Sequence, residues 1–173
     1  MKKILFSFLL FFLVVGLALW LFDHSLQSKL SLAPCAFCDQ RVIERQKFYE
    51  DDLVLALYDY KPICPGHCVI IPKRHVARLE DLSEEETCAI FHVIQRTQKA
   101  VAKAFFKENY FILQKNGASA GQTVAHVHFH FVPRQEEEKS LLAFLWHFCL
   151  HPIKKPLSAA EIDVERNKMK ENF

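Results

Sequence analysis

Short apolar runs separated by turn residues occupy the middle of the chain. Runs of this kind, apolar at consecutive or alternate positions, are typical of buried β-strands. Lys61-Pro62 and Pro65-Gly66 are typical of the turns between them. The pattern predicts strands at Leu53–Tyr58, Cys68–Ile71, Tyr110–Gln114 and Val124–Val132, and a short helix or strand at Val42–Phe48.

A helical period replaces this pattern after Ser83. Ser83 and Glu86 have the spacing of a capping box, which begins a predicted helix that runs to about Phe106. Apolar residues recur in it every 3.6 positions on average, as expected for a single buried stripe. The stripe consists of Ile90, Val93, Ile94, Val101 and Phe105.

Two further helices are predicted near the C-terminus. Residues 140–150 are rich in aromatic side chains, and Ser158 with Glu161 forms a second capping box. Antiparallel strands around one long helix make an α+β domain, which we place at residues 34–134 with a helical extension at 135–173.

The N-terminal segment has a different character. Ile4 to Phe22 contains no charged residue, and at ~1.5 Å per residue a helix of this length spans roughly one bilayer core. We therefore predict a membrane anchor at residues 1–22 and a linker at 23–33. Lys2 and Lys3 favour a cytoplasmic N-terminus, but the side of the membrane that the domain faces stays open. A cleaved signal peptide is the alternative, which small residues around Gly16 permit.

Composition restricts the class of protein. The chain has 173 residues, of which 51% are hydrophobic and 16 are Phe, so it can bury a substantial core. Its net charge of +2 arises from 22 basic and 20 acidic residues, and it shows no basic stripe that would indicate nucleic-acid binding. Six cysteines are compatible with disulfides in an exported domain, or with metal ligands and free thiols in the cytosol.

Three histidines alternate with apolar residues near the end of the domain. On a strand, His126, His128 and His130 would project from one face, because successive side chains point to opposite faces. Imidazoles titrate near neutral pH, so they bind metals, attack phosphorus or transfer protons. The preceding Gly121-Gln122-Thr123 turn can offer amides and a hydroxyl to an anion. An open metal site built from all three histidines is the rival interpretation.

Cys35 and Cys38 have the spacing of half a zinc site. On spacing alone a redox dithiol, or no special role, is also possible, but a redox motif would normally open a helix in a βαβ setting, which the sequence does not predict here. Cys64 and Cys68 offer one way to complete a four-ligand site. His75 and His126 offer another, which the sequence favours because Pro65-Gly66 makes the four-cysteine geometry awkward.

Motifs spread over most of the domain resemble those of bacterial members of the histidine triad (HIT) family. The central match is His126-Val-His128-Phe-His130-Phe-Val, which follows the family pattern of histidines alternating with apolar residues. The resemblance extends from about Pro34 to Arg134 and includes Cys35-x-Phe37-Cys38, Tyr49-Glu50-Asp51-Asp52, Leu57-Tyr58-Asp59, Pro65-Gly66-His67, Ile70-Ile71-Pro72-Lys73-x-His75 and Gly121-Gln122-Thr123-Val124.

The resemblance implies a nucleotide-binding homodimer that cleaves at the α-phosphate of a nucleoside. His128 would be the nucleophile that forms a nucleotidyl-histidine, with His130 beside the phosphate and Gln122 and Thr123 donating to its oxygens. Asp59 would accept hydrogen bonds from the ribose. Phe37 and Tyr58 would line the base pocket.

In zinc-bearing members of the family, the residues at Cys35, Cys38, His75 and His126 are the metal ligands. The zinc there is structural and leaves the middle histidine free for chemistry. One position departs from the family pattern: Lys115 stands beside Asn116 where an amide side chain usually contacts the phosphate or the leaving group. A lysine acts there as a point charge, which leaves the choice between a phosphoramidate and a dinucleotide polyphosphate open.

We therefore expect a membrane-anchored α+β HIT domain with structural zinc that acts on a purine nucleotide as a hydrolase or nucleotidyl transferase. The alternative is a membrane-tethered nucleotide sensor with weak or no turnover, for which Lys115 is the main argument.

Overall fold

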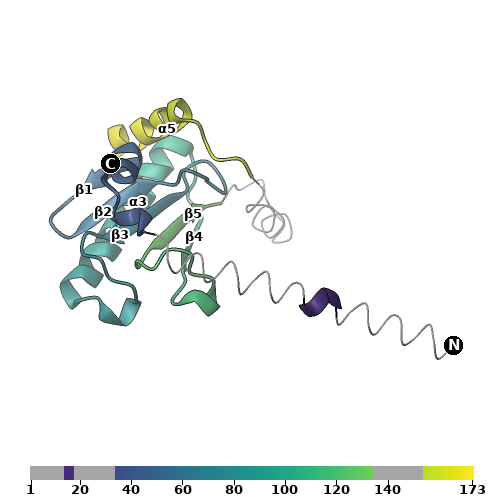
Figure 1. Ribbon diagram of the computed structural model, residues 1–173. Coiled ribbons are helices and arrows are strands. Elements are labelled where there is room, and N and C mark those ends of the chain that lie inside the picture. The colour runs from purple at the N-terminus through teal and green to yellow at the C-terminus, as the bar shows by residue number, and fades with distance from the viewer. Residues whose placement is uncertain (1–13, 18–33, 135–153) are drawn as a thin grey trace. The chain divides into compact units, whose positions relative to one another are not determined.

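A computed structural model of the chain describes residues 14–17, 34–134 and 154–173 (Figure 1). The chain divides into two units, Met1–Pro34 and Cys35–Phe173. In the first unit the structure describes Pro34 and residues 14–17, which are helical. The second unit carries the predicted domain and all of the candidate site residues.

The second unit is built on one antiparallel sheet. Its strand order is β1-β2-β3-β5-β4, and every neighbouring pair is antiparallel. The strands are β1 (Lys47–Glu50), β2 (Val54–Tyr58), β3 (Cys68–Pro72), β4 (Tyr110–Gln114) and β5 (Phe129–Pro133). The predicted α+β architecture is therefore confirmed, and the ambiguous segment around residue 45 contains a helix followed by a strand.

Helix α3 (Glu84–Phe105) lies against one face of the sheet (Figure 1). Both hydrogen bonds of its predicted capping box are present, from Glu86 N to Ser83 Oγ and from Ser83 N to the Glu86 carboxylate. The helix ends at Phe105 and is capped by Phe106, whose φ of 56° is left-handed. Its stripe packs on alternate residues of the central strands, and the largest core cluster includes Val54, Ala56, Tyr58, Ile70, Phe129 and Phe131.

Helix α5 (Ala159–Asn172) extends this layer. It begins at Ser158 with the second predicted capping box, and its buried Met169 joins the core beneath α3. Arg166 donates to the carbonyls of Glu44 and Arg45 in helix α2 (Gln40–Gln46). The helix predicted at residues 140–150 lies outside the residues that the structure describes.

Two short helices cover the opposite face of the sheet. The short helix η1 (Ala36–Cys38) and α2 contribute Phe37 and Ile43, which pack on the residues of β2 and β3 that point away from α3. These are Leu55, Leu57, Val69 and Ile71. His130 belongs to this face as well, because it pairs with Val69 and alternates with Phe129 and Phe131.

The predicted histidine strand is shorter than expected. We predicted Val124–Val132, but β5 begins at Phe129, so His126 and His128 precede it. Pairing of β5 with β3 covers only Cys68 to Ile70. Beyond this point the chain after β3 turns aside, and Val127 N donates to Val76 O instead of continuing the ladder.

The predicted membrane localisation is corrected by the structure. Among the residues that are described, no helix has the length and apolar character needed to cross a bilayer. The other residues of the predicted anchor, 1–13 and 18–22, and the linker at 23–33 lie outside the described part of the chain.

Candidate functional site

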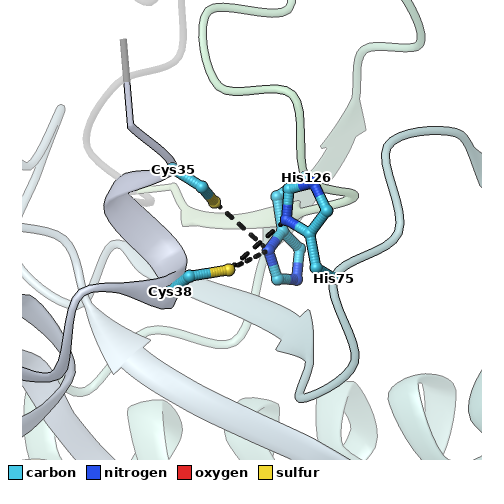
Figure 2. A group of neighbouring side chains, drawn as sticks. All are labelled: Cys35, Cys38, His75 and His126. Atoms are coloured by element: carbon cyan, nitrogen blue, oxygen red, sulfur yellow. Dashed lines mark hydrogen bonds between the residues drawn. The ribbon is translucent and has the colours of Figure 1, made fainter.

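Four residues from three distant segments converge into a cysteine–histidine cluster (Figure 2). The turn at η1, closed by Cys38 N donating to Cys35 O, brings both thiols to one side. His75 follows β3 directly, and His126 lies just before β5. These are the ligands that the sequence favoured, so the structure brings the whole predicted set together.

The spacing of the cluster fits a tetrahedral zinc ion. Bonds of ~2.3 Å to sulfur and ~2.0 Å to nitrogen place neighbouring ligands roughly 3.5 Å apart. His126 Nδ1 lies 3.4 Å from Cys35 Sγ and 3.7 Å from Cys38 Sγ. The distance from Cys38 Sγ to His75 Nδ1 is 3.3 Å.

Hydrogen bonding fixes His126 in the form that a metal requires. Its Nε2 lies 2.9 Å from the carbonyl oxygen of Pro72, which can only accept, so Nε2 carries the proton. The lone pair is therefore on Nδ1, which faces the thiols. Burial lowers the pKa of His126, which keeps the ring neutral. Burial and the adjacent Cys35 raise the pKa of Cys38 to about 11, so thiolates here need a cation beside them.

His128 has the opposite tautomer. Its Nδ1 lies 2.7 Å from the carbonyl oxygen of His126 and must donate to it, which leaves the lone pair on Nε2. Its ring is buried and packs 5.3 Å from the Phe37 ring. Burial lowers the pKa of His128, and the charge of Lys115 lowers it further. His128 is thus a neutral imidazole with a free nitrogen, as a nucleophile requires.

His130 lies beside His128 in a second group of polar side chains. The two rings are 5.0 Å apart, and His130 Nδ1 lies 3.0 Å from His67 Nε2. Asp59 completes the group: its Oδ2 lies 3.6 Å from His67 Nε2 and 3.8 Å from His130 Nδ1. Burial and the nearby His67 hold the pKa of His130 well below its usual range, so this ring is also neutral.

His67 belongs to the site, although the residue pattern did not assign it a role. It is 1% exposed and lies next to β3, two residues before Val69, which pairs with His130. Two residues along a strand return to the same face. His67 is therefore assigned to the site by the register between β3 and β5, and the sequence alone does not give that register.

The loop before the histidines is braced by two amide side chains, Asn116 and Gln122, of which Gln122 was predicted to bind phosphate. Gln122 accepts from Gly117 N and donates to Ala77 O, and Asn116 accepts from Leu79 N in η2 (Leu79–Asp81) and donates to Glu80. Thr123 is exposed. These amides hold the loop around η3 (Ala118–Ala120) in place.

Lys115 is the loop residue whose charge reaches the histidines. It lowers the pKa of both His128 and His130. The side chain lies over Gly121, where a Cβ would meet Lys115 Nζ at 3.6 Å. Gly121 has a φ of 82°, a conformation that glycine adopts without strain.

Tyr58 is not brought to this group. Its ring belongs to the core beneath α3, on the other face of the sheet from His130. Its hydroxyl accepts a hydrogen bond from Gly66 N, and burial raises its pKa well above the usual value. Leu57, one residue earlier, lies on the face on which Phe37 packs. Because side chains alternate along β2, Leu57 and not Tyr58 is the neighbour of Phe37.

Comparison with known proteins assigns the fold to a family. The model of the HIT domain matches residues 40–137, more than half of the chain. The matched range contains the whole sheet, α3 and all three histidines of the motif. The chain therefore belongs to the HIT domain family.

Relatives of known activity lie within this family. The chain is 39% identical over 109 residues to an adenosine 5'-monophosphoramidase of Schizosaccharomyces pombe, covering 62% of this chain and 79% of the relative. It is 40% identical over 95 residues to an asymmetrical bis(5'-nucleosyl)-tetraphosphatase of the same organism, covering 55% and 52%. A zinc-bound histidine triad family protein from Mycobacterium smegmatis superposes with a TM-score of 0.56 at 25% identity, covering 87% and 93%.

Proposed function

We propose that this HIT-family chain is a hydrolase or nucleotidyl transferase that cleaves at the α-phosphate of a purine nucleotide through a nucleotidyl-His128 intermediate. The observation that carries the proposal is the hydrogen bond from His128 Nδ1 to His126 O, which leaves the nucleophilic lone pair on Nε2. The names of the two curated relatives support the substrate class, a phosphoramidate or a dinucleotide polyphosphate.

The reaction proceeds in two displacements at phosphorus. The Nε2 lone pair of His128 forms a bond to the α-phosphorus as the bond to the leaving nitrogen or oxygen breaks, and the leaving atom keeps its electron pair and gains a proton. Water then forms a P–O bond and loses a proton, and the electron pair of the broken N–P bond returns to Nε2. Covalent catalysis of this kind divides one difficult displacement into two easier ones.

The remaining groups of the site bind and orient the nucleotide. Asp59 is 8% exposed and has an oxygen directed to the histidine group, where it accepts hydrogen bonds from the ribose. Phe37 packs against His128 and forms the wall beside the base. His130 donates to phosphate oxygens as negative charge develops.

Cys35, Cys38, His75 and His126 would hold a structural zinc ion. A closed set of two thiolates and two imidazoles is a common structural zinc site, and the ligand spacing described above fits it. When bound, the ion supplies a tetrahedral crosslink between η1, the end of β3 and the approach to β5. The same residues set the position of His126 O, on which His128 depends.

A homodimer is supported by the outer strand of the sheet. β4 is the last strand of the order, and Tyr110 and Ile112 on it are 42% and 38% exposed. An exposed apolar edge strand is a ready template for pairing with a second chain. Sedimentation equilibrium tests this, with the substitution Ile112→Lys expected to shift the population towards the monomer.

The test of the proposed activity is the release of AMP. We expect the zinc-loaded chain to release AMP from adenosine phosphoramidate or from diadenosine tetraphosphate, and we expect His128→Ala to release essentially none. His92→Ala is the matched control, since His92 is exposed on α3. Equal hydrolysis by wild type and His128→Ala would refute the assignment of the nucleophile.

The second candidate function is nucleotide sensing without turnover. The observation that favours it is Lys115, whose charge lies near both histidines where the family pattern has an amide. A sensor would bind AMP with an affinity that calorimetry detects, yet would release no AMP from either substrate over many hours.

A further inference from the structure

A chain of hydrogen bonds leads from a backbone amide to His130. Ile63 N lies 3.1 Å from His67 Nδ1, and His67 Nε2 lies 3.0 Å from His130 Nδ1. His67 is almost fully buried, at 1% exposed, between the turn that carries Ile63 and the strand that carries His130. The position of every proton in this chain follows from its first member.

A backbone amide can only donate, so His67 Nδ1 must accept the hydrogen bond from Ile63 N–H. A neutral imidazole that accepts at one nitrogen carries its proton on the other, which places the proton of His67 on Nε2. That N–H points to His130 Nδ1, which must therefore accept. The proton of His130 then lies on Nε2, the nitrogen directed away from His67.

We propose that His67 is a positioning residue that holds His130 in the Nε2–H tautomer, so that His130 donates a hydrogen bond to the phosphoryl group or the leaving group while His128 attacks. This inference rests on the proposed function, which it deepens by assigning a donor to the site. It also explains how two neighbouring histidines differ. His128 Nδ1 faces a carbonyl and keeps its proton, whereas His130 Nδ1 faces a donor and does not.

The position of Asp59 shows why the hydrogen bond from His67 to His130 is needed. Its Oδ2 lies 3.8 Å from His130 Nδ1, slightly beyond hydrogen-bond distance. A carboxylate at this position favours a proton on Nδ1, which would turn the lone pair of His130 towards the substrate. The donor from His67 occupies Nδ1 and opposes that preference. The other Asp59 oxygen, Oδ1, is held by Lys61 N at 2.8 Å.

The same three side chains also have the composition of a metal site, since Asp59, His67 and His130 direct one ligand atom each to a common point. The hydrogen bond at Ile63 argues against metal coordination there. A metal on His67 Nε2 would require its proton on Nδ1, where Ile63 N–H already donates. Two donors would then face each other, so the protonated Nε2 is the arrangement that the backbone supports.

The test uses two substitutions that separate the two ends of the His67 ring. In His67→Asn the amide reaches the position of Nδ1, so it still accepts from Ile63 N–H, but it is too short to donate to His130. In His67→Gln the amide reaches the position of Nε2 and keeps the donor. His92→Asn is the control, because His92 is exposed on α3.

The first readout is the tautomer of His130, measured by long-range proton–nitrogen correlation in the ¹⁵N-labelled, zinc-loaded chain without substrate. We expect an Nε2–H signature in wild type and in His67→Gln, and a shift towards Nδ1–H in His67→Asn. An Nδ1–H signature in wild type would overturn the proposal, and so would an unchanged Nε2–H signature in His67→Asn. Because no substrate is present, this readout stands independently of the proposed activity.

The second readout is kcat for AMP release. Complete loss of a transition-state donor lowers kcat by ~100-fold or more. For His67→Asn we expect kcat to fall by about tenfold, with a smaller change in KM. His67→Gln should restore most of this loss, and His92→Asn should match wild type. Equal losses in the Asn and Gln variants would show a purely structural role for His67 and overturn the proposal. Absence of AMP release from wild type would instead refute the proposed function.

Discussion

Two groups of side chains on one face of the sheet use the same histidine motif in opposite ways. In the cysteine–histidine cluster, His126 donates from Nε2 to Pro72 O and directs the lone pair of Nδ1 to two thiols. In the neighbouring group, His128 donates from Nδ1 to His126 O and keeps the lone pair on Nε2. The role of each imidazole is thus decided by the backbone group that holds its other nitrogen.

The two groups also differ in the partners that surround the lone pair. Two thiols and a second imidazole surround His126 Nδ1, and this set of soft and borderline ligands suits zinc. His128 instead lies against the Phe37 ring and within reach of the charge of Lys115. A buried, neutral ring near a cation suits attack on an anionic phosphate ester.

The largest effect is expected from removing the metal cluster. In Cys35→Ser we expect the zinc content, measured by atomic emission, to fall from about one per chain to nearly none. Because the cluster joins three separate segments, Tm should fall by roughly 10 °C or more, the shift that a loss of about 3 kcal/mol produces in a domain of this size.

The matched control is Cys88→Ser, since Cys88 is an exposed free thiol on α3. It should keep both zinc and Tm. A Cys35→Ser variant that retained a full equivalent of zinc would contradict the ligand assignment. The separation between the two groups predicts a complementary result, in which His128→Ala keeps its zinc.

A smaller loss is expected from Asp59→Asn. The substitution preserves the hydrogen bond that Oδ1 accepts from Lys61 N, but it removes the charge that receives the ribose hydroxyls. A hydrogen bond to a charged group contributes about 1.5–3 kcal/mol, so we expect KM for adenosine phosphoramidate to rise about tenfold or more. Asp52→Asn, at an exposed position, should have the KM of wild type. Equal KM values for both variants would remove Asp59 from the nucleotide site.

The pH dependence of turnover distinguishes a buried nucleophile from an exposed one. Burial holds the pKa of His128 below the ordinary 6.5, and only the neutral ring attacks. As the pH falls, activity is therefore retained through 6.5 and is lost only as the pH passes the lower pKa. A profile of kcat/KM that already falls between pH 7.5 and 6.5 would contradict a neutral, buried His128.

The smallest effect is expected at Lys115. Since its charge lowers the pKa of His128, Lys115→Gln should move the acid limb of the pH profile to higher pH. The Lys115→Gln substitution should also change, by about a few-fold, the ratio of kcat/KM for adenosine phosphoramidate to kcat/KM for diadenosine tetraphosphate. Lys103→Gln on the exposed side of α3 is the control. An unchanged profile and ratio would show that Lys115 has no part in the reaction.

Local signals in the sequence predicted the regular elements well. The capping boxes at Ser83 and Ser158 begin α3 and α5 as predicted, and β4 has the predicted bounds. Cap hydrogen bonds and apolar periods depend on neighbours within a few residues, so a linear pattern contains the information. The spacing of Cys35 and Cys38 likewise predicted that they belong to one cluster, which the structure forms.

The parts of the site that sequence reasoning missed depend on which strands are neighbours. Tyr58 and Leu57 are both apolar-run residues, and only the pairing of β2 shows that Leu57 faces Phe37 while Tyr58 lies under α3. His67 becomes a partner of His130 only when β3 lies beside β5. The late start of the histidine strand has a similar cause, since its pairing with β3 goes no further than Ile70 opposite Phe129.

The division of labour among the histidines is tested most directly by locating the covalent intermediate. The zinc-loaded chain is mixed with adenosine phosphoramidate, quenched within one turnover and digested, and the adenylylated residue is identified by mass spectrometry. We predict adenylylation at His128, with His126 and His130 unmodified and zinc still bound before the quench. Adenylylation of His126 or His130 in place of His128 would contradict the account.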